Sequence, residues 1–214
     1  ISVMRQGEYM GTVDKKDTNQ AELAKMMVGR EVFLNIEKKQ AHIGDTVLKI
    51  DNLWTSGEKE MSKIRGVSLE VKSGEIVGIA GIDGNGQSEL IEAICGLRKV
   101  EKGSILLDGK NITNESVKKI RKAGLSHIPE DRNVRGLNRS MTIEENIVAA
   151  QISDAPFSNG IMLNNTKMLE YTNELIDKFD IRPRNPQTLT QGMSGGNAQK
   201  IVVAREVSIG GKEA

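Results

Sequence analysis

Apolar and polar residues follow regular spacings from residue 46 onward, and these spacings predict a mixture of strands and helices. Alternation over 46–50 and over 63–71 predicts two strands that each bury one face. The continuous apolar run over 75–81 predicts a strand that is buried on both faces, as in a parallel sheet. Residues 105–110 contain an Asp-Gly pair and predict a hairpin, and residues 125–128 predict a further strand.

Apolar residues at helical spacing predict helices in the same part of the chain. Thr142 and Glu145 form a capping box ahead of one of them, and Asn165 or Thr166 is expected to cap the next. The predicted helices cover 87–95, 115–123, 143–151, 167–179 and 197–207. The order of strand, glycine-rich turn and helix at 75–95 is typical of the opening of an α/β nucleotide-binding unit.

The first forty residues have a different pattern. Residues 1–13 predict a hairpin, and a short helix is expected to end near Gly29, with Thr18 or Asn19 as its cap. Residues 33–45 have weak periodicity and several charges, which suits a linker. Because so short a segment cannot bury a core of its own, we expect it to pack against other sequence.

Composition narrows the functional classes. The 214 residues include 30 Lys and Arg against 29 Asp and Glu, so the net charge of +1 gives no electrostatic case for nucleic acid as a partner. The single cysteine excludes an internal disulfide and fits a reducing compartment. One cysteine and two histidines are too few ligands for a Cys/His zinc site. No apolar run approaches the roughly 18–20 residues that span a bilayer. We therefore expect a cytosolic protein.

Residues 81–88 have the spacing of a Walker A phosphate loop, G-x-x-x-x-G-K-S, with Gln87 in place of the lysine. The glycines let backbone N–H groups turn toward a phosphate, and the following helix directs its positive end at it. Ser88 stands where a hydroxyl would bind Mg²⁺. Because Gln87 supplies no charge, we expect weak nucleotide binding and poor catalysis at this loop. The alternative is a tight strand–helix turn with no ligand.

A second glycine-rich segment precedes the last predicted helix. Ser194, Gly195 and Gly196 place open backbone N–H groups and a hydroxyl donor at a helix start, which suits an anion. The alternative is an ordinary N-cap followed by flexible glycines. Neither motif is specific when it is taken alone.

Together the two motifs resemble the nucleotide-binding domain of ABC transporter ATPases. Between them the chain reads His-Ile-Pro-Glu-Asp-Arg over 127–132, and this resembles the second ATPase half of tandem importers for simple sugars and nucleosides. In that family half, Pro-Glu-Asp-Arg replaces the usual Q-loop sequence, the phosphate loop lacks its lysine, and the signature motif reads Ser-Gly-Gly-Asn; all three features occur here. Residues 83–90 look most like the nucleoside-uptake branch.

The resemblance implies an α/β fold of the P-loop NTPase, ABC type, with a RecA-like parallel sheet core, an antiparallel β-subdomain and a helical subdomain. Residues 1–40 would be the C-terminal tail of a preceding nucleotide-binding domain plus a linker. Residues 45–214 would be the second such domain, incomplete because no apolar strand ending in Asp, the Walker B strand, follows the signature helix. With the Walker B carboxylates missing, no catalytic residue is expected here.

The resemblance also assigns site residues, with ATP and Mg²⁺ as the cofactors. The expected nucleotide-binding residues are Gly81, Asp83, Gly84, Asn85, Gly86, Gln87, Ser88, Glu89 and Trp54, and Ser88 would also hold the metal. The expected signature residues are Ser194, Gly195, Gly196, Asn197 and Gln199. Trp54 would stack on adenine, although a partly buried core role is the alternative. Glu130 stands at the Q-loop position, either as a Mg²⁺ ligand or as a solvated carboxylate.

In this family the signature motif of one half closes over ATP held by the other half. The expected partners are therefore the first nucleotide-binding half or a second copy, transmembrane permease subunits and, indirectly, an extracellular solute-binding lipoprotein, with the chain peripheral on the inner face of the plasma membrane. Two alternatives belong to other classes: a soluble phosphate-loop enzyme such as a nucleotide kinase or GTPase, and a non-transport ABC protein. The missing lysine with Ser-Gly-Gly-Asn argues against the first, and the Pro-Glu-Asp-Arg sequence argues against the second.

Overall fold

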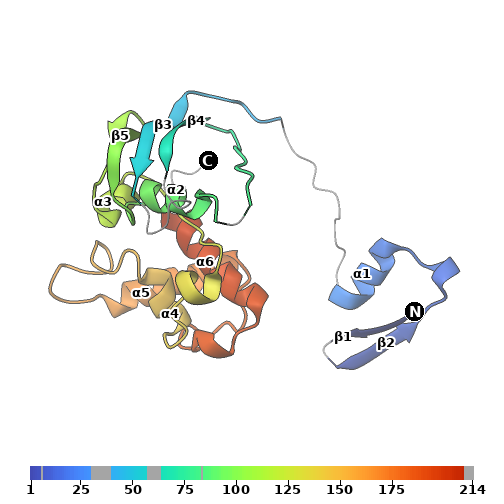
Figure 1. Ribbon diagram of the computed structural model, residues 1–214. Helices are drawn as coiled ribbons and strands as arrows, with labels where there is room; N and C mark the ends of the chain where they lie inside the picture. Colours follow the sequence, from blue (N-terminus) through green and yellow to red (C-terminus); the bar gives the residue numbers. More distant parts are fainter. Residues whose placement is uncertain (6, 30–39, 57–63, 83, 210–214) are drawn as a thin grey trace. The chain divides into compact units, whose positions relative to one another are not determined.

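The computed structural model describes residues 1–5, 7–29, 40–56, 64–82 and 84–209 (Figure 1). The chain divides into two compact units, Ile1–His42 and Ile43–Ala214, which are called the smaller and the larger unit below. Most of the predicted linker lies outside the described residues. Each unit is described separately.

The smaller unit consists of an antiparallel hairpin and one helix. Strand β1 (Ser2–Arg5) pairs with β2 (Glu8–Thr12), and a 3₁₀ turn, η1 (Lys15–Asp17), leads to α1 (Gln20–Val28). The side chain of Asn19 accepts a hydrogen bond from the backbone N–H of Glu22 at 2.9 Å, which makes Asn19 the cap. The predicted hairpin and helix are thus confirmed. Among the described residues of this unit, Val3 alone is a buried apolar side chain.

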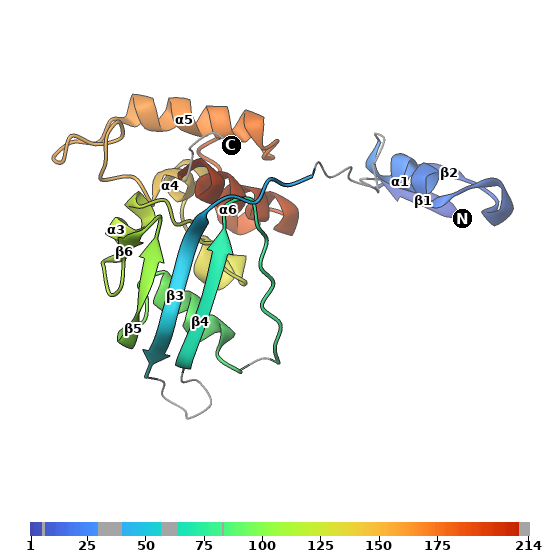
Figure 2. The same ribbon diagram turned by 90° about the horizontal axis from the view of Figure 1, so that it is seen from above.

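The larger unit begins with an antiparallel sheet whose strand order is β4-β3-β5-β6 (Figure 2). The strands are β3 (Thr46–Thr55), β4 (Arg65–Lys72), β5 (Val100–Leu107) and β6 (Lys110–Asn111). Helix α2 (Gln87–Ile94) packs against one face and buries Leu90, Ala93 and Ile94 in a cluster with side chains from the strands. Helix α3 (Val117–Lys122) adds Ile120 to the same cluster. The predicted Asp-Gly hairpin forms, with both residues at positive φ.

The rest of the larger unit is helical. It contains α4 (Ile143–Val148), α5 (Asn165–Lys178) and α6 (Gly195–Ile209), with the π-helical turn η3 (Arg132–Gly136) and the 3₁₀ turn η4 (Thr190–Gly192). Thr142 and Glu145 form the predicted capping box of α4. Asn164 caps α5, so the predicted cap is wrong by one residue. Helix α6 starts two residues earlier than predicted and extends from the helical part to the sheet (Figure 1).

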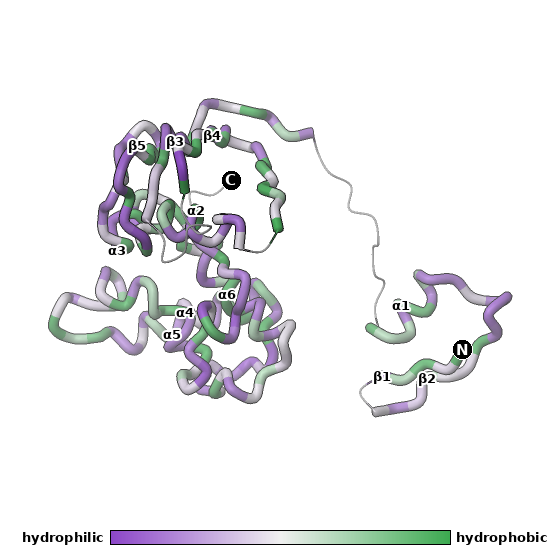
Figure 3. The backbone as a smooth tube through the Cα atoms, in the orientation of Figure 1, coloured by the Kyte–Doolittle hydropathy of each residue, from purple (hydrophilic) through white to green (hydrophobic). Residues whose placement is uncertain are grey.

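Two predicted strands are not strands. The apolar run 75–81 forms no regular secondary structure and pairs with no strand, and Ile76 is 92% exposed. Hydrophobic positions recur along this exposed segment after β4 (Figure 3). Residues 125–128 are likewise without ladder partners. A parallel strand needs hydrogen-bonded neighbours, and the sheets formed by the described residues are all antiparallel. The described residues therefore include the antiparallel and helical parts but not a parallel core.

One glycine allows β3 and β5 to approach closely where β3 is irregular. Gly103 has φ +90°, and a Cβ built on it would overlap the carbonyl oxygen of Asn52 and lie 2.5 Å from that of Asp51. Asn52 itself has φ +46°, and the register of β3 shifts around it. Only a residue without a side chain fits at position 103.

We expect Gly103→Ala to lower the free energy of unfolding by more than about 3 kcal/mol, because the obstructing atoms are backbone and cannot move without breaking the strand pairing. Gly109→Ala is the matched control. Gly109 is also left-handed, with φ +73°, but a Cβ there has no neighbour within 4 Å, so only the conformational cost of about 1–2 kcal/mol applies. Urea unfolding measures both variants; equal losses would contradict the close approach.

Candidate functional site

The predicted phosphate loop, residues 81–88, leads from the irregular segment 75–81 into α2. Gly84 and Gly86 adopt φ +86° and +102°, and a Cβ on Gly86 would lie 3.1 Å from the Ile64 side chain. No side chain caps α2, so the first N–H groups of the helix lack a capping acceptor. The loop therefore ends in an open helix N-terminus, the arrangement that favours an anion. Asp83 lies outside the described residues.

Gln87 folds back across the loop that it closes. Its amide Nε2 donates to the carbonyl oxygen of Ile82 at 3.4 Å, and the same amide group contacts Gly81. A ligand that approaches the loop amides at Gly81 would have to displace this side chain. Gln87 thus puts a neutral amide against the loop backbone.

A cavity of about 340 Å³ lies beside the start of α2. Its lining residues are Gln87, Ser88, Ile91, Glu92, His127, Ile128, Glu130 and Arg135. The structure thus brings the predicted metal ligand Ser88 and the predicted Q-loop residue Glu130 to one cavity, although 42 positions separate them in the sequence. A hydroxyl and a carboxylate are oxygen ligands of the kind that Mg²⁺ accepts.

Glu130 is exposed and only loosely paired. Its Oε1 lies 3.5 Å from Nη1 of Arg135, and its side chain is 64% exposed. The same guanidinium nitrogen lies 3.2 Å from Oε1 of Glu92, which α2 contributes. Arg135 therefore bridges α2 and the segment that carries Glu130, and the Glu130 carboxylate keeps access to solvent and to the cavity.

Trp54 lies on the outer surface of the sheet. Its two neighbours in β3, Leu53 and Thr55, are buried, whereas Trp54 is 38% exposed and belongs to neither hydrophobic cluster. The core interpretation is therefore wrong. The indole Nε1 donates to Oδ1 of Asn52 at 2.9 Å, and Nζ of Lys102 lies 5.9 Å from the ring centroid. The residues lining the cavity beside α2 do not include Trp54.

The predicted signature residues, 194–199 (called the signature segment below), lie at the start of α6. Ser194, Gly195 and Gly196 are exposed, and Gln199 lies on the exposed side one turn later. Nδ2 of Asn197 donates to Oγ of Ser194 at 3.0 Å, and Oδ1 of Asn197 accepts from the backbone N–H of Arg182 at 2.8 Å. Asn197 therefore fixes the serine hydroxyl and ties the helix start to the chain before it.

A network of charges supports the loop that Asn197 holds. The Arg182 side chain donates to the Asp180 carboxylate at 2.9 Å and, with a smaller contribution from Lys200, holds the pKa of Asp180 below its ordinary value. Lys200, on α6, also donates to the backbone carbonyl of Asp180 at 2.5 Å. These contacts fasten residues 180–182 to α6 just behind the signature segment.

Arg132 adds positive charge at the same helix end. A Cβ on Gly195 would lie 2.6 Å from Nη2 of Arg132, so the guanidinium sits against the first residue of α6. Nε of Arg132 is buried, and among the described residues it has no hydrogen-bond partner. The guanidinium and the positive end of the helix repel each other, and an anion bound between them would offset that repulsion.

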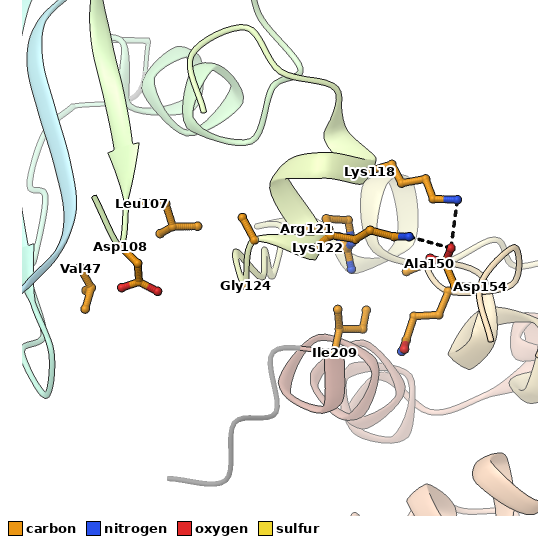
Figure 4. A pocket seen from close by; sticks show the side chains of 12 residues that line it. Val47, Leu107, Asp108, Lys118, Arg121, Lys122, Gly124, Ala150, Asp154 and Ile209 are labelled. Carbon is orange, nitrogen blue, oxygen red and sulfur yellow. Dashed lines mark hydrogen bonds and ion pairs between the residues drawn. The ribbon is translucent and has the colours of Figure 1, made fainter. Parts of the chain in front are cut away.

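The residues that line the cavity beside α2 include none of 194–199. A larger cavity of about 520 Å³ lies elsewhere, between α3, Asp154 and the end of α6 (Figure 4). Lys122 and Lys118 both pair with Asp154 there, and their hydrogen bonds lower its pKa. Asp154 carries one negative charge against two ammonium groups, so it offsets only part of their positive charge.

Comparison with known proteins places this arrangement in a family. A family model described as ABC transporter matches residues 64–211. Among solved structures, a dimeric ATP-binding cassette, MJ0796, in a post-hydrolysis state bound to ADP and Pi has a TM-score of 0.60 at 24% identity, covering 76% of this chain and 69% of that one. At that identity the likeness shows the fold alone, and it confirms the expected fold class. The chain belongs to the ABC transporter family.

The related sequences include importers. The guanosine import ATP-binding protein NupO of Bacillus subtilis is 44% identical over 207 residues, covering 97% of this chain and 41% of that protein. The nucleoside import ATP-binding protein NupA of Lactococcus lactis is 43% identical with the same coverage. The chain therefore spans about two fifths of the length of these curated relatives. Within the described residues, no helix is both long enough and apolar enough to cross a membrane.

Asn197 offers a test of how the signature segment is held. Asn197→Ala removes the acceptor for the Arg182 amide and should lower the free energy of unfolding by about 1 kcal/mol. Asn197→Asp keeps that acceptor and adds a negative charge near the helix N-terminus, so it should retain the wild-type value. Thermal and urea unfolding compare the two variants; an equal loss in both would show that the Arg182 contact contributes nothing.

Proposed function

We propose that this chain is part of the ATP-binding subunit of an ABC importer that couples ATP binding and hydrolysis to the uptake of nucleosides or simple sugars. The observation that carries the proposal is the similarity to two nucleoside import proteins along 97% of the chain. Residues 1–40 would be the tail of a preceding nucleotide-binding domain with its linker, and residues 45–214 the second domain.

The phosphate loop is the proposed ATP site. Its residues Gly81 to Glu89 would hold the phosphates through loop and helix amides, and the Ser88 hydroxyl would bind Mg²⁺. Two features support the fit: the uncapped start of α2, and the adjacent cavity shared by Ser88 and Glu130. The neutral Gln87 makes this a degenerate site with weak affinity. Trp54 would reach adenine only if the base lies over the outer face of the sheet.

The signature segment is the proposed second contact with ATP. Ser194, Gly195 and Gly196 would bind the γ-phosphate of a nucleotide held by the first nucleotide-binding half or by a second copy. Their exposure, the fixed Ser194 hydroxyl and the nearby Arg132 guanidinium support this role. The further partners would be transmembrane permease subunits and, through them, an extracellular solute-binding lipoprotein, which places the chain at the inner face of the plasma membrane.

A non-transport ABC ATPase, or another P-loop nucleotide-binding enzyme, is the alternative. The names of these two relatives favour import. Affinity purification of the full protein from membranes separates the two, because an importer subunit should bring a permease with it.

Gln87→Lys should tighten the binding of ATP–Mg²⁺ to this chain by about tenfold or more, equivalent to about 1.4 kcal/mol, because the ammonium group supplies the missing charge. Isothermal titration measures the affinity. Gln187→Lys adds the same charge at an exposed loop position and should change the affinity by less than about twofold. Equal effects of the two substitutions would show that residues 81–88 are not a phosphate site.

Ser194→Arg should abolish uptake by the complete transporter, because a long side chain would block the triphosphate from the helix amides. Uptake of radiolabelled nucleosides and sugars into proteoliposomes provides the measurement. Ser140→Arg, at an exposed position before α4, is the control and should transport normally. Normal uptake by the Ser194 variant would refute the proposed contact.

A further inference from the structure

A buried carboxylate on α6 holds together segments that are distant in the sequence. Glu206 is 1% exposed and lies near the end of α6, away from the signature segment. Its Oε2 accepts from Nη2 of Arg121 at 2.8 Å and from the backbone N–H of His127 at 3.2 Å. Its Oε1 accepts from Nε of Arg205 at 2.8 Å. Burial of a charge costs several kcal/mol unless donors compensate, and here three donors do so.

The neighbouring Arg205 extends this network. Its Nη2 donates to the carbonyl oxygen of Gly136 at 2.9 Å, and its Nη1 donates to that of Asn146 at 3.3 Å. The backbone carbonyl of Glu206 accepts from the Ser126 hydroxyl at 2.7 Å. Residues 126–136 are called the connecting segment below. Glu206 bonds to the start of this segment and Arg205 bonds to its end.

The connecting segment touches both candidate sites. His127, Ile128, Glu130 and Arg135 line the cavity beside Ser88. Arg132, within the same segment, lies against Gly195 at the start of α6. One stretch of chain thus borders the cavity at the phosphate loop and the first residue of the signature helix, and its two ends are fixed by Glu206 and Arg205.

We infer that Glu206 is a positioning residue that couples the connecting segment rigidly to α6. A change in conformation at the cavity beside Ser88 is thereby transmitted to the signature segment. The inference rests on the proposed function for the assignment of the two sites. Glu206 touches no nucleotide in this scheme and acts through Glu130 and Arg132. Loss of its charge would free the start of the segment while the helices stay intact.

Hydrogen exchange measured by mass spectrometry on this chain tests the inference. Glu206→Gln should speed exchange at least about tenfold at 132–136 and about threefold at 198–200, which lies about 9–12 Å from position 206 along the helix at 1.5 Å per residue. Glu174→Gln, exposed on α5, is the control and should change neither region. Faster exchange only next to residues 127 and 206 would mean a local structural role and would overturn the inference.

Added ATP–Mg²⁺ extends the test. In the wild-type chain it should slow exchange at 84–90 and also at 198–200, whereas in Glu206→Gln it should slow exchange at 84–90 alone. Protection that still reaches 198–200 in the variant overturns the inference. No protection at 84–90 in the wild-type chain contradicts the proposed ATP site instead, and the ligand-free comparison still decides the role of Glu206.

Kinetics of the complete transporter provide a readout that stability alone would not move. Glu206→Gln should lower kcat for ATP hydrolysis about tenfold and leave KM within about twofold, because the phosphate loop is unchanged. An unchanged kcat, or a raised KM with normal kcat, overturns the inference. If the Glu206 variant does not accumulate, Arg121→Lys replaces it in the test, because it keeps a charge beside Glu206. Arg121→Lys should lower kcat by a smaller factor and leave KM within about twofold, and an unchanged kcat would overturn the inference.

Discussion

The buried ion network around Glu206 is the interaction on which the larger unit depends. It joins α6 to α3 through Arg121, to the backbone at His127 and, through Arg205, to Gly136 and α4. Among the described residues, the sheet part and the helical part form separate hydrophobic clusters. The buried Glu206 carboxylate holds the segments that donate to it in fixed positions. If any donor moved away, part of the carboxylate would lose its hydrogen bond in a place that water does not reach.

The two glycine motifs of this ABC transporter family member both lie at the N-terminus of a helix. Each includes a polar side chain that bonds within the motif: Gln87 at α2 and Asn197 at α6. Gln87 bonds back to its own loop, whereas Asn197 holds Ser194 in an exposed position. The Gln87 amide therefore covers the loop backbone at Gly81 and Ile82, whereas the Asn197 amide leaves Ser194 exposed.

Local signals in the sequence predicted local structure well. The Asp-Gly hairpin, the capping box at Thr142 and Glu145 and the cap of α1 all depend on residues a few positions apart. The first two are confirmed, and of the two candidates for the third, Thr18 and Asn19, the structure shows Asn19. The strands at 75–81 and 125–128 were wrong because an apolar run forms a strand only beside hydrogen-bonded neighbours, which the described residues do not supply.

The candidate site was only partly predictable, for the same reason. The motifs at 81–88 and 194–199 could be read from spacing, and the structure puts both at helix starts. The contacts of Glu206 with Arg121 and His127 span about 80 residues, and no periodicity encodes such a pair. Sequence spacing does not predict the position of Arg132 against Gly195 either, because 63 residues separate the two.

The amide at position 87 has a consequence for how the loop would respond to its surroundings. Dissolved ions screen the attraction between a lysine and a phosphate, so affinity at an ordinary loop of this type falls as ionic strength rises. A neutral hydrogen-bond donor has no such attraction to lose. Whatever Gln87 contributes to holding a phosphate is therefore nearly the same in dilute and in concentrated salt.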